Sequence, residues 1–317
     1  MSNSVVMSRY KISIVIPVYG VEPYIRKFAE SVFDQTYHNI EYVFVNDGTK
    51  DASMEVLESL ICEKYEHLRE HIVIVNKDNE GLPMARKTGL ENAHGEYVIL
   101  VDSDDWMEPN AIEKIIAKAE DTNADFIYFD FIKEYSHRKS IKHERKYKAD
   151  NKDMYIINLF NLKSFGYTWS KCFRRSLYTD NTIHFPKYGM HEDICIMSQI
   201  IFYAKSFAYI PEVLHHYRLD NPNSISVQNI HTRHLASIRN MLDLCAHFKE
   251  HPKGTPTEKV AGGVYIRAGW YAMVHGYDLW SEYPWLAQEI KKSKLSTHYR
   301  SSLLTQLIVK LYTCIFR

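Results

Sequence analysis

The sequence predicts an α/β fold with a mostly parallel sheet flanked by helices, followed by a mainly helical C-terminal region. Between residues 11 and 130, short β-branched apolar runs alternate with amphipathic stretches, the pattern of buried strands and covering helices. From residue 231 onward, apolar residues recur at helical spacing almost throughout. With 317 residues and 45% hydrophobic composition, the chain can bury a large core, as one domain or as a domain with an appendage.

Five apolar runs are the predicted strands of the first half. Because they are apolar on both alternating faces, we expect central, largely parallel strands. The runs are 12–16, 42–45, 72–75, 97–101 and 126–129. Helical patterns lie between them at 22–35, 51–67, 83–93 and 109–120, and Pro83 and Pro109 stand at or near the start of two of these helices.

The second half begins with a polar, strongly basic stretch at residues 133–152. We interpret it as a solvated loop or an exposed hairpin, with a flap over an acceptor as the alternative. Further on, the pattern predicts helices at 153–162 and 192–204, strands at 207–210 and 213–217, and then helices broken at 251–254 and near Tyr283-Pro284.

Residues 291–317 predict a basic amphipathic helix. They contain six Lys or Arg residues and no Asp or Glu. Apolar side chains recur there at helical spacing: Leu303, Leu304, Leu307, Ile308, Leu311, Tyr312 and Ile315. Such a helix can lie in an anionic membrane interface, or pack on its own domain or on a partner subunit, and the sequence leaves both interpretations open.

The overall composition excludes several classes of protein. Lys plus Arg equals Asp plus Glu at 39 each, so no global field attracts nucleic acid, and we expect no nucleic-acid partner. The cysteines are five and scattered, without the close pairs of zinc or redox sites, which favours a reducing cytoplasm. No signal peptide and no run of roughly 18 to 20 apolar residues is present, so we expect a protein that is neither exported nor transmembrane.

Polar residues follow three of the predicted strands, where ligands bind in parallel sheets. Pro17 to Tyr19 follow the first, Asn46 and Asp47 the second, and Asp102 to Asp105 the fourth. The three carboxylates of the last group repel each other, so we expect a cation there; oxygen ligands suit Mg²⁺ or Mn²⁺, which would bridge to a diphosphate. The alternative is that one carboxylate caps the next helix and the others are solvated, and that Asp47 belongs to a simple turn.

Two further places carry candidate chemistry. Arg86 lies in the first turns of a helix after Gly81, suited to an anionic phosphate or to orienting the acidic cluster. Glu192 and Asp193 precede an amphipathic helix, as helix caps or as a general base. The pair His215-His216 fits packing better than metal binding. The glycine patterns of P-loop and dinucleotide-binding proteins are missing, which counts against a triphosphatase and a dehydrogenase.

Together these residues resemble the GT-A family 2 glycosyltransferases, bacterial enzymes that build capsular, O-antigen and exopolysaccharides. The resemblance rests on six fragments in order: SIVIPVYGVEPYIRKFAESVFDQTY, EYVFVNDGTKDAS, NEGLPMARKTGLENAHGEYVILVDSDDWMEP, WSKCFRR, HEDI and HHYRLDNPNSIS. It implies a GT-A domain over residues 1–226, with a nucleotide-sugar half at about 11–105 and an acceptor half at 106–226. Residues 227–317 then form a helical region with the basic amphipathic end.

The resemblance also implies roles for residues of the nucleotide-sugar half. Pro17 and Tyr19 would flank the nucleobase, and Asp47 would bind uracil or ribose. Asn46, which the resemblance also places at the donor nucleotide, stands where the family usually has an aspartate. Arg86 resembles the arginine that helps to hold the acidic loop beside the donor.

The acidic cluster and the second half receive the remaining roles. Asp102 and Asp104 form the D-x-D motif, with Asp104 as the direct ligand of Mn²⁺ or Mg²⁺ and Ser103 beside the donor. Asp193, with Glu192, resembles the general base. On the acceptor side lie Trp169 and Lys171.

The resemblance implies a metal-dependent, inverting transferase that moves a sugar from a nucleotide sugar, a UDP-sugar in our expectation, to a saccharide or lipid-linked saccharide. We expect it in the cytoplasm, at the inner face of the membrane if the basic helix binds lipid. One alternative is an inactive subunit that binds nucleotide sugars without turnover. A nucleotidyltransferase is a weaker alternative, because it would need a glycine-rich basic loop where this chain has VYGVE.

Overall fold

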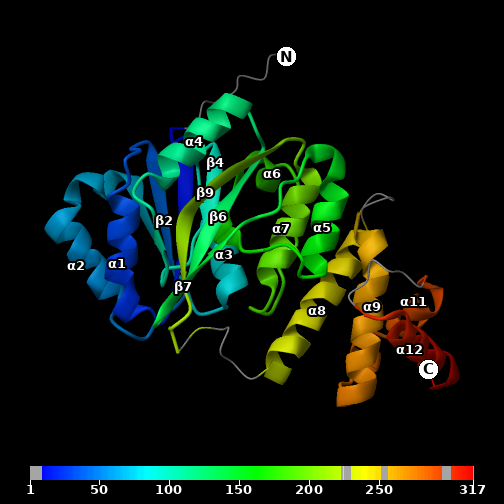
Figure 1. Cartoon of the computed structure of the whole chain (residues 1–317). Coiled ribbons are helices and arrows are strands. Elements are labelled where there is room, and N and C mark those ends of the chain that lie inside the picture. The colour runs from blue at the N-terminus through cyan, green and yellow to red at the C-terminus, as the bar shows by residue number, and fades with distance from the viewer. Residues whose placement is uncertain (1–8, 223, 225–229, 251–255, 295–300, 317) are drawn as a thin grey trace, which may run out of the picture.

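The computed structural model describes residues 9–222, 224, 230–250, 256–294 and 301–316. Within them, a mixed sheet forms the centre of the molecule, in the order β3-β2-β1-β4-β8-β6-β9-β5, with β7 paired to β6 (Figure 1). The strands are β1 (Ile12–Val18), β2 (Ile40–Asn46), β3 (Ile72–Asn76), β4 (Tyr97–Leu100), β5 (Trp106–Met107), β6 (Phe126–Tyr135), β7 (Arg138–Lys142), β8 (Lys171–Arg174) and β9 (Phe207–Arg218).

All five strands predicted for the first half are present, and β1 to β4 are mutually parallel. The expectation that all five are central is wrong for β3, which lies at the edge of the sheet with half-buried side chains. Its side chains are only half-buried because β3 has a single neighbouring strand, β2. The two strands predicted at 207–210 and 213–217 form one strand, β9, whose pairing with β6 shifts register near Asp130.

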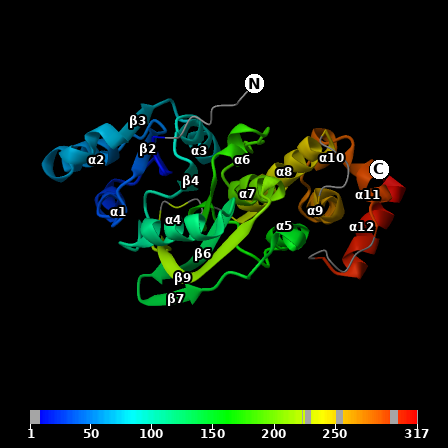
Figure 2. The same ribbon diagram turned by 90° about the horizontal axis from the view of Figure 1, so that it is seen from above.

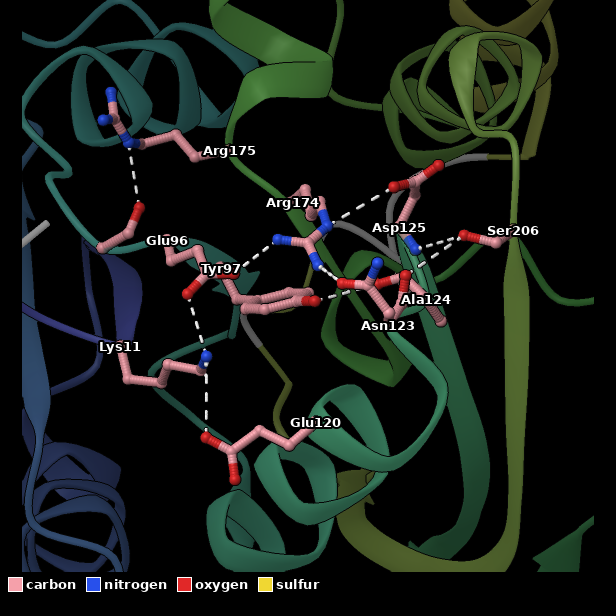
Figure 3. Close-up of polar contacts among 11 residues, drawn as sticks. Lys11, Glu96, Tyr97, Glu120, Asn123, Ala124, Asp125, Arg174, Arg175 and Ser206 are labelled. Carbon is pink, nitrogen blue, oxygen red and sulfur yellow. Dashed lines mark hydrogen bonds and ion pairs between the residues drawn. The ribbon is translucent and has the colours of Figure 1, made fainter. Parts of the chain in front are cut away.

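Strand β8 was not predicted, and it is antiparallel to both of its neighbours, β4 and β6. Strand β8 lies between β4 and β6 in the sheet. Its last residue, Arg174, forms ion pairs with Glu96 and Asp125 and a hydrogen bond to Asn123 Oδ1 (Figure 3). Lys11 Nζ reaches the same Glu96 at 2.9 Å. These contacts are partly exposed and individually weak, but together they join β1, β4, β6 and β8 at the edge opposite the strand ends discussed below.

Helices cover both faces of the sheet. They are α1 (Glu22–Phe33), α2 (Ser53–Lys64), α3 (Leu82–Glu91), α4 (Ala111–Thr122), α5 (Lys152–Phe160), α6 (Ser176–Thr179) and α7 (Glu192–Tyr203). Alternate residues of β1 point into two separate cores: Ile14 packs with α1, α2 and α4, and Val15 with α3, α5 and α7. Helix α3 approaches β1 so closely that a Cβ on Gly89 would lie 2.2 Å from Val15 Cγ1. This contact sets the position of the helix that carries Arg86.

The region after β9 is helical, as predicted. Its helices are α8 (Ile230–Lys249), α9 (Pro256–His275), α10 (Leu279–Glu282), α11 (Leu286–Lys292) and α12 (Leu303–Phe316). They extend away from the sheet, and α12 lies at the far end of the molecule (Figures 1 and 2). The break near Pro284 separates α10 from α11, whereas the break predicted at 251–254 lies outside the described residues.

The basic stretch at 133–152 contains the exposed hairpin of the prediction, formed by the end of β6 and by β7. Among the described residues, no helix is long and apolar enough to cross a membrane.

Candidate active site

A cavity of about 820 Å³ opens where β1, β2 and β4 end. Loops from neighbouring parallel strands meet at this edge, and the volume is typical of a small-molecule site. The cavity gathers ten of the residues predicted from the sequence: Pro17, Tyr19, Asp47, Arg86, Asp102, Ser103, Asp104, Trp169, Glu192 and Asp193. The other two, Asn46 and Lys171, are not among the residues that line it.

The Asp47 carboxylate fixes the loop that leads into α3. It accepts hydrogen bonds from the backbone N–H groups of Gly81 at 2.9 Å and Glu80 at 3.1 Å, and it lies 3.3 Å from Lys77 Nζ. Gly81 has a φ of 87°, a left-handed conformation that favours glycine. Asp47 is therefore buried at the cavity wall with both carboxylate oxygens engaged by the opposite loop.

Asn46 shapes the adjoining turn and does not reach the cavity. Its Oδ1 accepts from the backbone N–H of Thr49 at 3.0 Å, and its Nδ2 donates to Asn76 Oδ1 at 2.9 Å. Pro17 and Tyr19, by contrast, line the cavity at the end of β1, and Tyr19 is exposed there. The Pro17 carbonyl accepts from Ser103 Oγ at 2.6 Å, which ties the loop after β4 to β1.

Arg86 connects the acidic loop after β4 with the start of α7. Its guanidinium is buried and donates to Asp102 Oδ1 at 2.5 Å and, through the other terminal nitrogen, to Glu192 Oε1. The two carboxylates raise the pKa of Arg86 despite its burial, so it stays charged. Burial raises the pKa of Glu192 to about 8, and Asp193 and Asp102 add to this effect while Arg86 opposes it.

The three carboxylates after β4 point in different directions. Asp102 and Asp104 line the cavity, and Asn221 Nδ2 donates to Asp104 Oδ2 at 2.7 Å. Asp105 points into the protein, where it is fully buried and lies 2.9 Å from His215 Nε2. Burial, with the neighbouring Asp105 and Asp102, raises the pKa of Asp104 to about 7.

This donor set suits Mg²⁺ or Mn²⁺ bound together with a ligand. The described residues contain no group of three or more potential metal ligands. However, Asp102 and Asp104 each keep one carboxylate oxygen outside the hydrogen bonds just described. Mg²⁺ is commonly held by one or two carboxylates with waters and substrate phosphates completing the shell, so the two aspartates fit such an ion.

The histidine pair in β9, opposite β5, has a structural role. His215 contacts Asp105, and His216 lies 2.8 Å from Glu134 Oε1 and 2.7 Å from Glu108 Oε1. Neither histidine lines the cavity. The interpretation of this pair as packing residues therefore agrees with their contacts.

Trp169 and Lys171 flank the start of β8 but face different surroundings. Trp169 lines the cavity and stacks between Tyr167 and His215, at centroid distances of 4.6 and 4.5 Å. Lys171 is fully buried and forms an ion pair with Glu144. The two side chains diverge because Trp169 belongs to the 3₁₀ turn Thr168–Ser170, whereas Lys171 is the first residue of β8.

Helix α8 completes the cavity with residues that the sequence analysis missed. Arg233 lines the cavity, and four residues later Ser237 Oγ lies 2.6 Å from His191 Nδ1. Asn240 Nδ2 donates to the carbonyl oxygens of Tyr188 and Met190 at 2.7 and 2.9 Å. These contacts hold the segment that enters α7, just before Glu192 and Asp193. No motif identified α8, while Asn221 lay inside a fragment of the resemblance without an assigned role.

The α/β domain has its cavity at the strand ends and an aspartate pair after β4, an arrangement that agrees with the GT-A fold. The model of glycosyl transferase family 2 matches residues 13–182, and the chain belongs to that family.

Curated relatives agree with this assignment. The chain is 34% identical over 214 residues to the putative glycosyltransferase EpsH of Bacillus subtilis, covering 66% of this chain and 60% of EpsH. It is 34% identical over 220 residues to the glycosyltransferase GlyA of Streptococcus pneumoniae, covering 66% of this chain and 30% of GlyA. The match thus spans less than two thirds of the length of these relatives. Their names give no support to the alternative of an inactive binding subunit.

Solved structures show the same fold. The structure of S. aureus TarS 1-349 in complex with UDP-GlcNAc has a TM-score of 0.66 at 17% identity, covering 96% of this chain and 89% of that one. The mannosyltransferase PcManGT from Pyrobaculum calidifontis, in complex with GDP-Man and Mn²⁺, has a TM-score of 0.55 at 14% identity, covering 96% and 88%. At these identities the likeness establishes the GT-A fold.

Proposed function

We propose that this protein transfers a sugar from a nucleotide sugar, specifically a UDP-sugar, to a saccharide or lipid-linked saccharide in the synthesis of a cell-surface polysaccharide. The observation that carries the proposal is that one cavity holds Asp47, the Asp102-Asp104 pair and Asp193. These groups match the three needs of the reaction: binding of a nucleoside, neutralisation of a diphosphate, and removal of a proton.

The roles divide along the chain. Residues 11–105 would bind the donor, with the base beside Pro17 and Tyr19 and the nucleoside against Asp47. Residues 106–226 would provide the acceptor side, including Trp169, and 227–317 a helical region that supports it. Lys171 and Asn46 would act through the packing of β8 and through the loop after β2, since both lie outside the cavity lining.

Asp104 and Asp102 would hold Mn²⁺ or Mg²⁺, which neutralises charge on the departing diphosphate when it is bound. Ser103 and Arg86 keep this pair in place, Ser103 through its bond to the Pro17 carbonyl and Arg86 through its bond to Asp102. Arg86 also bonds to Glu192, the neighbour of Asp193. One buried side chain therefore connects the proposed metal ligands with the segment of the proposed base.

Asp193 would be the general base of a single displacement that inverts the anomeric configuration. The acceptor oxygen forms a bond to the anomeric carbon while the bond from that carbon to the diphosphate oxygen breaks. The hydroxyl proton passes to Asp193, and the nucleoside diphosphate leaves. Glu192 is buried against Arg86 and positions this segment.

We place the reaction on the cytoplasmic side of the membrane. All five cysteines, Cys62, Cys172, Cys195, Cys245 and Cys314, are free, which is typical of proteins from reducing compartments.

The test measures nucleotide release and donor binding for a panel of UDP-, GDP- and dTDP-sugars, with Mn²⁺, Mg²⁺ or EDTA. The samples are the wild type, Asp104→Ala, Asp193→Ala and, as a control, Asp121→Ala on the exposed side of α4. We expect metal-dependent release from one UDP-sugar that is lost in both site variants and kept in the control. Failure of the wild type to bind any nucleotide sugar would overturn the proposal.

A further inference from the structure

Helix α12 turns its large apolar side chains away from the rest of the molecule. Eleven large hydrophobic residues are exposed in the described part of the chain, and six of them lie on this one helix. Their exposed fractions range from 40% to 69%. We call these six residues the α12 stripe: Leu303, Leu304, Leu307, Ile308, Leu311 and Ile315. Their spacing places them along one side of the helix.

The opposite side of α12 is the one that packs on the protein, and it is largely polar. Gln306, Val309 and Thr313 are fully buried there. Lys310 Nζ donates to the carbonyl oxygens of Ile290 and Lys291, at 3.1 and 3.0 Å, where α11 ends. A cation at the end of a helix also interacts favourably with its dipole. The polar side of α12 therefore packs against the rest of the protein, and the α12 stripe remains exposed.

The surroundings of the stripe are positively charged. Lys291, Lys292 and Lys294 are exposed beside the end of α11, next to the contact with Lys310. Residues 291–317 contain six Lys or Arg residues and no acidic residue, in a chain whose formal net charge is zero. Glu289 on α11 lies 3.8 Å from Lys292 Nζ, but the lysines outnumber it. An apolar stripe beside a mainly basic surface is complementary to a membrane, whose interior is apolar and whose headgroups are anionic.

We propose that the α12 stripe lies in the interface of an anionic membrane, with the helix axis parallel to the surface. At 14 residues the helix is too short to span a bilayer, so its apolar side would enter the boundary between headgroups and acyl chains. Lys291, Lys292 and Lys294 would contact the phosphates of the headgroups.

The charge pattern favours a membrane over a second copy of this chain. A two-fold dimer through α12 would bring the same surface of both copies together, including the lysines, and like charges across an interface are unfavourable. The stripe is also remote from the cavity, because none of the described residues after Arg233 lines the cavity. Binding through α12 thus leaves the cavity accessible, and the inference stands independently of the proposed donor.

The experiment is sedimentation of the full chain with vesicles of phosphatidylcholine alone or mixed with phosphatidylglycerol. The first variant combines Leu304→Gln, Leu307→Gln and Leu311→Gln, and its matched control combines Ile141→Gln, Met154→Gln and Val274→Gln, which are exposed apolar residues elsewhere. The second variant combines Lys291→Gln, Lys292→Gln and Lys294→Gln, against Lys163→Gln, Lys187→Gln and Lys205→Gln.

We expect the wild type and both controls to bind the anionic vesicles and to bind phosphatidylcholine vesicles weakly. The stripe variant should lose at least about tenfold in partitioning, since burial of apolar area drives the insertion. Each lysine removed should weaken binding to the anionic vesicles about fivefold. Melting curves and nucleotide release without vesicles should match the wild type in every variant.

Two results would overturn the proposal. One is a wild type that does not sediment with anionic vesicles while its nucleotide release is intact, which would leave the proposed transfer reaction untouched. The other is a stripe variant that binds them as the wild type does. If light scattering then shows a wild-type dimer that the stripe variant abolishes, the occupant of the stripe is a second copy.

Discussion

Arg233 brings a positive charge into a cavity whose other charged groups are mainly carboxylates. Its Nε is buried and has no hydrogen-bond partner, and no ion pair with Arg233 occurs in the described ranges of the chain. Arg86, the other arginine of the cavity, is already bound to Asp102 and Glu192. Arg233 is thus the arginine whose charge remains for an anionic part of the proposed substrates.

We therefore expect Arg233→Ala to lower kcat/KM by about 10- to 100-fold, the effect of losing one hydrogen bond to a charged group. Arg233→Lys should restore part of the loss, because the charge is kept without the planar fork. Arg239→Ala is the matched control, since Arg239 lies on the same helix but pairs with exposed Glu282. Equal kinetics for Arg233→Ala and Arg239→Ala would exclude this role.

At the scale of residues, position along the chain predicted most of the cavity. The ends of buried parallel strands can be found in a sequence, and the polar residues after β1, β2 and β4 did gather at one edge. What could not be predicted is which of three nearly adjacent aspartates faces inward. That choice depends on His215, which is the buried partner of Asp105 and lies 110 positions further along the chain.

At the scale of elements, the contact between α7 and α8 contains a half-buried histidine. His184 precedes α7, and Gln199 on α7 contacts its backbone N–H and carbonyl groups, both at 2.8 Å. Its ring stacks on His247 of α8 at a centroid distance of 5.2 Å, and its Nε2 is buried without a partner. Burial lowers the pKa of His184 below its ordinary value of 6.5, although Asp243 opposes the shift.

This shift makes the contact sensitive to acid. As the pH falls through 6.5, the unfolded chain takes up a proton at His184 before the folded chain does, so stability is lost. His184→Phe keeps an aromatic ring against His247 and removes the titration. We expect the melting temperature of the variant, relative to the wild type, to rise as the pH is lowered below 6.5. Parallel pH profiles for the two proteins would contradict the assignment.

Elements with strong periodicity were predicted well, and short ones were not. A short window of sequence is enough to predict the apolar runs of β1, β2 and β4 and the amphipathic helices α1 and α4. Strand β8 has four residues and exists because β4 and β6 lie on either side of it, so no local pattern distinguishes it. The edge position of β3 is likewise a property of the sheet order.

At the scale of the whole molecule, the helical region holds the segment that leads to the proposed base. Asn240 is fully buried on α8 and makes three hydrogen bonds with the backbone of the segment before α7, to the carbonyls of Tyr188 and Met190 and from the N–H of Tyr188. The proposed base, Asp193, follows that segment directly. The position of the base thus depends on a helix beyond the last strand.

We expect Asn240→Leu to reduce the free energy of unfolding by about 2–3 kcal/mol or more, because it leaves buried backbone groups unpaired. It should also lower kcat much more than it weakens donor binding. The control is Ile238→Ala, which removes buried apolar contacts from the same helix at a cost of about 2–5 kcal/mol. Urea unfolding and nucleotide release separate the two effects, and a similar loss of kcat in both variants would show that only stability matters.

The bonds from Asn240 and Ser237 also bear on how such enzymes could be recombined. A chimera joined near residue 226 would combine the segment before α7 from one parent with α8 from another. The hydrogen bonds from Asn240 to the Tyr188 and Met190 carbonyls would then form only if the two parents share this geometry. Exchanging residues 183–250 as a single cassette would transfer the loop together with the side chains that hold it. If a proposed acceptor side is exchanged between relatives, residues 183–250 should therefore move together, and the junction should not lie between the sheet and the helices.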